Sequence, residues 1–248
     1  QAQIMLKDII DNHRFDARAV FGLYPAQRTG ADTVSVFDEA GQNRTHTFEH
    51  VRQQSDKVTG KPNLSLADYI KPSEQPEDYL GGFTVSIFGA EELANEYKAK
   101  GDDYSAILVQ SLADRFAEAF AEHLHERICK EFWGYKADET LSNEELIKEK
   151  YVGIRPAPGY PACPEHSEKA VLFDWLGSEA KIGTKLTEHF AMMPPSSVSG
   201  YYYSHPESEY FNVGKISQDQ LEDYAKRKGW TLDVAKRWLA PNLDDSIV

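Results

Sequence analysis

The segment from residue 153 to residue 166 constrains the fold more than any other stretch of the chain. It reads GIRPAPGYPACPEH and places four prolines within nine positions. Because each proline fixes φ and lacks a backbone N–H, the segment fits neither a helix interior nor a central strand. We therefore expect a stiff, extended loop that carries Arg155 at its start and leaves backbone carbonyls without partners.

Two functions are open for this loop. A guanidinium holds a carboxylate with two parallel hydrogen bonds, and a carbonyl accepts from an ammonium, so the loop suits a zwitterionic ligand. In the alternative, the loop is a stiff connector whose arginine covers a helix end or forms a surface ion pair with Glu145 or Glu149. The residues of this segment do not by themselves separate the two functions.

Composition narrows the class of protein. A chain of 248 residues buries one sizeable core or two small ones. It has no apolar run of membrane-spanning length and no signal peptide, which predicts a soluble, cytoplasmic protein with no membrane partner. The net charge of −13 argues against nucleic acid as a partner. Cys129 and Cys163 form no Cys-x-x-Cys pair, which is typical of reduced thiols rather than of a disulfide or zinc site.

Hydrophobic periodicity predicts both helices and strands in the first part of the chain. A helix is expected over 3–12, with Met5, Ile9 and Ile10 on one face. The same reasoning predicts strands over 18–24, 33–38, 45–48 and 83–88, a short helix over 65–70 and a helix over 90–98.

The longest predicted element is a helix over 103–133, preceded by an N-cap at Asp102. Its apolar stripe consists of Leu108, Leu112, Phe116, Ala119, Phe120, Leu124, Ile128 and Phe132. His123 and His125 diverge on this helix, so they do not bind one metal ion together.

The second half of the chain predicts further helices and strands. A capping box, Ser142-Asn-Glu-Glu145, begins a helix that ends before the proline loop. Beyond the loop we expect a helix over 165–176, a strand over 185–192, a β-hairpin of 198–203 with 210–216, a helix ended by Gly229 and a last helix from Thr231. The result is an α+β single domain over residues 1–248, with a mostly antiparallel sheet flanked by helices, one of them long.

Several motifs resemble one family over nearly the whole chain. Arg155-x-x-x-Gly159-Tyr160, inside the proline loop, is similar to the S-adenosylmethionine loop in the activation domain of cobalamin-dependent methionine synthase. The likeness continues through the segments 21–26, 102–104, 185–192, 197–206 and 237–243. It implies a domain of a methyltransferase of methionine biosynthesis, with S-adenosylmethionine as its ligand.

The resemblance also implies which residues bind this ligand: Arg155, Ala157, Gly159, Tyr160, Glu118, Tyr210 and Phe211. Arg155 would contact the amino-acid end, and a partly buried Glu118 would pair with the ligand ammonium or with Arg155. Tyr210 and Phe211 would stack on adenine or contact the sulfonium. From periodicity alone, Glu118 fits an exposed helix face with Glu122 equally well, and His166 and Asp114 are weaker candidates.

The implied function is reductive reactivation. When the cobalamin of the parent enzyme is oxidised to cob(II)alamin, an electron from a flavodoxin-like or diflavin protein and a methyl group from S-adenosylmethionine restore it. The domain would only position the methyl group, with no catalytic side chain or metal of its own. Because no Asp-x-His-x-x-Gly motif is present, another domain would hold the cobalamin, and the isolated chain would not turn over alone.

Two expectations concern the extent of the site. The chain starts at Gln1, and the resemblance is to the last part of a larger enzyme, which predicts a fragment that lacks the N-terminal edge of the domain and an acidic ligand contact there. The alternative function is a docking module for the cobalamin domain and a flavoprotein, with an incomplete ligand site. Its candidate docking surface is the basic cluster Lys226, Arg227, Lys228, Lys236 and Arg237.

Overall fold

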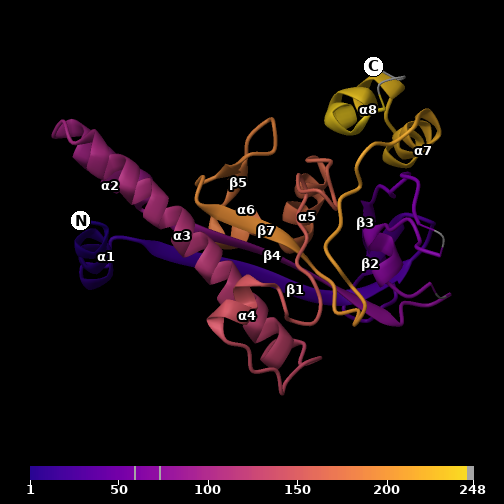
Figure 1. Cartoon of the computed structure of the whole chain (residues 1–248), viewed down its shortest axis with the longest axis horizontal. Helices are drawn as coiled ribbons and strands as arrows, with labels where there is room; N and C mark the ends of the chain where they lie inside the picture. Colours follow the sequence, from indigo (N-terminus) through magenta and orange to yellow (C-terminus); the bar gives the residue numbers. More distant parts are fainter. Residues whose placement is uncertain (59, 73, 245–248) are drawn as a thin grey trace.

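An antiparallel sheet forms the centre of the computed structural model, which describes residues 1–58, 60–72 and 74–244 (Figure 1). Its five strands lie in the order β3-β2-β1-β4-β7. They are β1 (Asp16–Arg28), β2 (Thr33–Phe37), β3 (Arg44–Glu49), β4 (Asp78–Phe88) and β7 (Ser197–Tyr202). Every pairing is antiparallel, so the predicted α+β class is confirmed.

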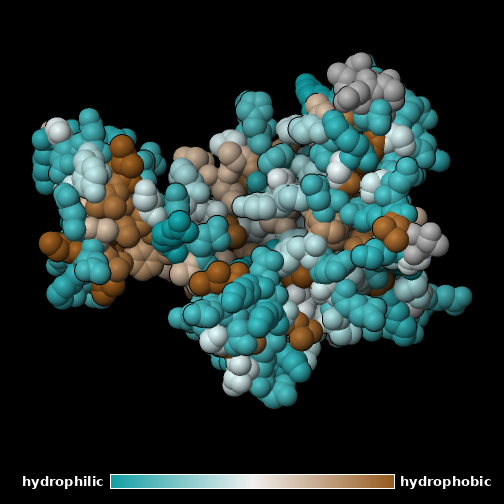
Figure 2. Space-filling view, viewed as in Figure 1, coloured by the Kyte–Doolittle hydropathy of each residue, from teal (hydrophilic) through white to brown (hydrophobic). Residues whose placement is uncertain are grey.

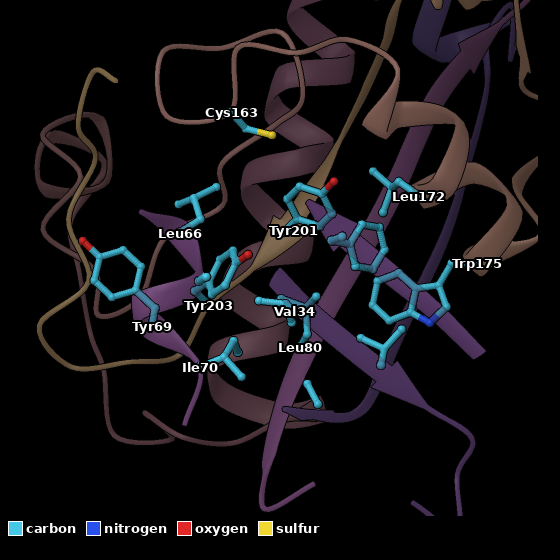
Figure 3. Packing of buried hydrophobic residues seen from close by; sticks show 14 of the residues in the cluster. Val34, Leu66, Tyr69, Ile70, Leu80, Cys163, Leu172, Trp175, Tyr201 and Tyr203 are labelled. Atoms are coloured by element: carbon cyan, nitrogen blue, oxygen red, sulfur yellow. The ribbon is translucent and has the colours of Figure 1, made fainter. Parts of the chain in front are cut away.

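Side chains alternate between two cores, one on each face of the sheet. Tyr201 and Tyr203 belong to one core with Leu172 and Trp175, and Tyr202 between them belongs to the other. Figure 3 shows Tyr201 and Tyr203 among the residues of the first core, close to Cys163 of the proline loop. Because successive strand residues point to opposite faces, β7 contributes to both cores.

A long helix, α3 (Asp103–Arg127), covers the Tyr202 face and continues into a π-helical turn, Ile128–Phe132. Asp102 caps it by accepting from the Ser105 N–H at 3.0 Å, as predicted. Of the predicted apolar stripe, Leu124 and Ile128 are buried against the sheet as expected, but along the rest of the helix the contact is made by smaller residues: Ala106, Val109, Ala113, Ala117 and Ala121. Small side chains allow the helix axis to lie close to the sheet.

Two shorter helices, α1 (Ala2–Asp11) and α2 (Ala90–Ala99), extend this layer. Met5 and Ile9 are buried as predicted, but Ile10 is 54% exposed. Figure 2 shows apolar side chains on the surface of this end of the molecule, whereas hydrophilic residues dominate much of the rest of this view. None of the helices among the described residues has the length and apolar character needed to cross a bilayer.

The other face carries α5 (Glu168–Leu176) and α6 (Ser178–Ile182). The remaining elements are η1 (Leu66–Tyr69), α4 (Asn143–Ile147), α7 (Gln218–Lys228), α8 (Leu232–Leu239) and η3 (Ala240–Asn242). The capping box at Ser142 and the end of α7 at Gly229, where φ is 66°, are confirmed. The helix predicted from residue 165 begins only at Glu168.

Two predicted strands are wrong. Residues 185–192 instead contribute to a small hairpin of β5 (Lys185–Leu186) and β6 (Met192–Met193). Residues 210–216 form no strand beside β7, because the proline loop takes that edge. Ile154 exchanges two backbone hydrogen bonds of 3.0 Å with Tyr203, and Tyr201 donates to the Pro156 carbonyl at 2.9 Å.

The proline loop approaches β7 closely because residue 200 is a glycine. A Cβ atom on Gly200 would lie 2.6 Å from the Pro156 carbonyl oxygen, a distance at which the loop would have to move. The chain after β7 then passes along the other side of the loop, where the Val213 N–H donates to the Pro161 carbonyl at 2.9 Å. The loop is therefore held between β7 and the segment 210–216.

A buried cluster of charged groups joins α7 to the start of α5. Lys228 donates to Glu168 and lies 3.8 Å from Glu165, and both glutamates are fully buried. Arg227 pairs with Glu49 and Asp223. Lys228 and Arg227 are therefore committed to internal pairs, and the predicted basic docking surface is smaller than the sequence suggested.

The buried Glu168 makes stability depend on pH. Burial, only partly offset by Lys228, raises the pKa of Glu168 from 4.5 to about 7. A carboxyl whose pKa is raised on folding stabilises the fold below pH 4.5 and loses this contribution as the pH rises toward 7. Between pH 4.5 and 7, this group should lower the free energy of unfolding of the unmodified protein by on the order of 3 kcal/mol. We expect Glu168→Gln to abolish this pH-dependent loss, measured by urea denaturation.

The matched control for this prediction is Glu91→Gln, which changes an exposed glutamate in the first turn of α2. This variant should keep the pH dependence of the unmodified protein. An unchanged slope in Glu168→Gln would show that other groups cause the pH dependence.

Candidate functional site

A cavity of about 360 Å³ lies between the proline loop, α3, β7 and the segment after β7. All but one of the predicted ligand residues line it: Arg155, Ala157, Tyr160, Glu118, Tyr210 and Phe211. Its volume falls within the range of roughly 300–1,000 Å³ typical of small-molecule sites. The structure therefore brings together residues that lie far apart in the sequence.

A larger cavity of about 480 Å³ lies at the start of α2 and contains Asp114, one of the weaker candidates. Asp114 accepts from the Ser196 hydroxyl at 2.7 Å. None of the predicted ligand residues lines this second cavity. We therefore take the smaller cavity, where cation, carboxylate and aromatic groups meet, as the candidate site.

The proline loop forms one wall of the site. It is extended only as far as Ala157, because turns follow in which the Cys163 N–H donates to the Tyr160 carbonyl at 2.9 Å, and its carbonyls are not left without partners. Those of Pro156 and Pro161 accept from Tyr201 and Val213, and that of Ala157 accepts from Tyr160 at 3.1 Å. The prediction of unpaired carbonyls is wrong because neighbouring segments pack on both sides of the loop.

Gly159 lies outside the cavity wall and controls the shape of the loop. Its φ is +93°, and a Cβ atom there would lie 2.4 Å from the imidazole of His166. The ring of His166 thus packs against the backbone at Gly159. Burial, together with nearby Lys169, lowers the pKa of His166.

Arg155 is held by α3. Its guanidinium donates to Glu122 and, from Nη1, to His125 Nδ1 at 2.9 Å. Only 17% of the side chain is exposed, yet it lines the cavity. The alternative ion pair with Glu145 or Glu149 is wrong, since the acidic partner comes from a helix distant in the sequence.

Glu118 lies on α3 one turn before Glu122, with its side chain exposed at the edge of the cavity. The expected partial burial is wrong, and Arg155 pairs with Glu122 instead. Within the described parts of the chain Glu118 has no ion-pair partner, so its carboxylate is available to a cation in the cavity.

Tyr210 and Phe211 line the cavity from an irregular segment and not from a strand. The Tyr210 hydroxyl accepts from the Arg155 N–H at 3.0 Å and lies 3.1 Å from the Tyr151 hydroxyl. Burial raises the pKa of Tyr210 above its ordinary value. Tyr160, which is 61% exposed, stands at the rim.

Sequence reasoning missed the floor of the cavity, formed by Phe83, Val198 and Ser199. The Ser199 hydroxyl is buried and has no hydrogen-bond partner among the residues that the structure describes. It also missed Glu122 and His125 as partners of Arg155. Glu122 and His125 lie four and seven positions after Glu118, which places all three on one helix face. This spacing is the sequence pattern from which the two partners of Arg155 could have been predicted.

We expect Gly159→Ala to distort the loop. The new methyl group would collide with His166 and would also place alanine at a positive φ, so we expect a loss of roughly 1–3 kcal/mol in the free energy of unfolding. Gly101→Ala is the matched control, because φ there is +76° but nothing lies within 4 Å of the added Cβ. Equal losses in urea denaturation would show that His166 does not restrict this position.

Comparison with known proteins gives two findings. Residues 1–229 match the family described as "Vitamin B12 dependent methionine synthase, activation domain". A solved structure, "Crystal Structure of the MetH Reactivation Domain bound to AdoHcy", superposes with a TM-score of 0.93 at 49% sequence identity. The match covers 98% of this chain and 75% of that one.

Proposed function

The chain belongs to the activation-domain family of vitamin B12-dependent methionine synthase, and from this we propose that it binds S-adenosylmethionine and presents the methyl group for reductive remethylation of cob(II)alamin. One observation carries the proposal: a cation, an available carboxylate and aromatic side chains converge on one cavity. The AdoHcy bound by the similar MetH domain supports it, because AdoHcy is S-adenosylmethionine without the transferred methyl group.

The cavity matches the ligand group by group. Arg155 pairs with the carboxylate of the amino-acid end, and Glu118 receives its ammonium. Phe211 and Tyr160 provide faces for adenine and for the sulfonium, which an aromatic ring attracts electrostatically. Ala157 lines the wall, Gly159 sets the turn of the loop behind it, and Ser199 offers a hydroxyl on the floor.

The residues of this chain need only bind and orient. When the methyl group leaves a sulfonium, the C–S bonding pair stays on a neutral thioether, which is a good leaving group, so methyl transfer requires no proton transfer and no side-chain nucleophile. Cobalamin, held by another domain of the parent enzyme, would supply the nucleophile. The stiff proline loop then contributes by keeping the methyl group in one place.

The proposal extends to two partners. One is the cobalamin domain of the same enzyme, which must reach the rim of the cavity where Tyr160 is exposed. The other is a flavodoxin-like or diflavin protein that supplies the electron. Family membership supports both partners, and the isolated chain, without them, is not expected to turn over.

We expect Arg155→Met to weaken S-adenosylmethionine binding by at least about tenfold, because charge-assisted pairs are worth roughly 1.5–3 kcal/mol. Isothermal titration calorimetry measures this, with AdoHcy as a second ligand. Thermal unfolding of the variant should stay cooperative. Arg44→Met, which removes an exposed arginine of β3, should bind normally. Unchanged affinity in Arg155→Met would refute the proposed role of Arg155.

A further inference from the structure

The Arg155 side chain is oriented before any ligand arrives. We propose that Glu122 and His125 are positioning residues, which aim the guanidinium of Arg155 so that its remaining N–H groups face the ligand carboxylate. This inference rests on the proposed function and adds to it the residues that determine recognition of the amino-acid end. Neither Glu122 nor His125 is among the residues that line the cavity.

The two residues offer Arg155 a pair of acceptors on one helix face. Glu122 and His125 lie three positions apart on α3, so their side chains project on the same side of the helix. Nη2 of Arg155 donates to Glu122, and Nη1 donates to His125 Nδ1 at 2.9 Å. A guanidinium is a planar fork with further N–H groups, so fixing two of its nitrogens also fixes the direction of the others.

His125 acts here as an acceptor. An arginine only donates, so Nδ1 must be unprotonated and the ring hydrogen must be on Nε2. Burial and the charge of Arg155 lower the pKa of His125 to about 3, which keeps the ring neutral near pH 7. Nε2 is buried and, within the described residues, has no hydrogen-bond partner. The hydrogen bond that the imidazole makes is therefore the one that Nδ1 accepts from Arg155.

Aromatic side chains hold the imidazole in place. Tyr202 stacks on it with ring centroids 5.2 Å apart and an interplanar angle of 24°. Tyr151 meets it edge-on at 4.6 Å, and the same Tyr151 ring lies 5.3 Å from Cζ of Arg155. The acceptor therefore has one orientation, and so does the guanidinium that it holds.

The backbone of Arg155 is held as well, by the hydroxyl of Tyr210. A long side chain restrained at both ends loses little conformational freedom on binding, which saves part of the entropy cost of recognition. Glu122 and His125 should therefore affect the part of the ligand that Arg155 contacts, the carboxylate, and not the adenosyl part.

Two ligands that differ only in the carboxylate test this inference. S-adenosylmethionine and its decarboxylated analogue share adenosine, sulfonium and ammonium. We expect Glu122→Gln and His125→Leu each to weaken binding of the first by about tenfold and of the second by less than about twofold, measured by calorimetry. His125→Asn, which keeps an acceptor near the position of Nδ1, should restore most of the affinity.

Two controls separate positioning from general effects. Glu126→Gln removes an ion pair with Lys130 from the same helix and should change neither affinity. In an Arg155→Met background, Glu122→Gln should cause no further loss. Thermal unfolding of each variant verifies that it is folded. If His125→Leu does not fold, Glu122→Gln alone provides the test.

The outcomes distinguish this inference from the proposed function. Suppose that the unmodified protein prefers S-adenosylmethionine over its decarboxylated analogue. If the variants then bind both ligands as the unmodified protein does, or lose affinity for both ligands equally, Glu122 and His125 do not position Arg155. If the unmodified protein binds both ligands with the same affinity, Arg155 does not hold a carboxylate, and the proposed role of Arg155 falls together with this inference.

Discussion

The antiparallel contact between the proline loop and β7 is the interaction on which the rest of the site depends. Ile154 and Pro156 are hydrogen-bonded to Tyr203 and Tyr201, which places Arg155 opposite Tyr202. Directly opposed residues of an antiparallel pair share a face. Arg155 therefore points to the face covered by α3, while Ile154 joins Tyr201 and Tyr203 in the other core. The N–H of Arg155 points away from β7, and Tyr210 accepts from it.

This arrangement links the stability of the core to the geometry of the site. Tyr202 packs in the core beneath α3 and also stacks on His125, the acceptor for Arg155. The loop is in turn held on its outer side by Val213. The guanidinium of Arg155 is thus held by packed elements and not by a mobile surface side chain.

Much of the fold follows from local sequence signals. The cap at Asp102, the capping box at Ser142 and the end of α7 at Gly229 are local events, so they could be predicted. The hairpin predicted over 198–203 and 210–216 failed for a non-local reason. Alternation and turn residues suggested that consecutive segments would pair, whereas the edge of β7 was taken by a proline-containing segment that cannot donate at Pro156.

For the candidate site, the sequence by itself determined that a stiff loop would present an arginine and that its family resemblance would select Arg155, Glu118, Tyr160, Tyr210 and Phe211 as a set. Only the tertiary structure decided that these residues share one cavity, that Gly159 shapes the loop against His166, and that Glu122 and His125 hold Arg155. The physical reason is distance along the chain. Backbone restrictions act between neighbouring residues, whereas the partners of a buried charge are set by which elements the sheet brings together.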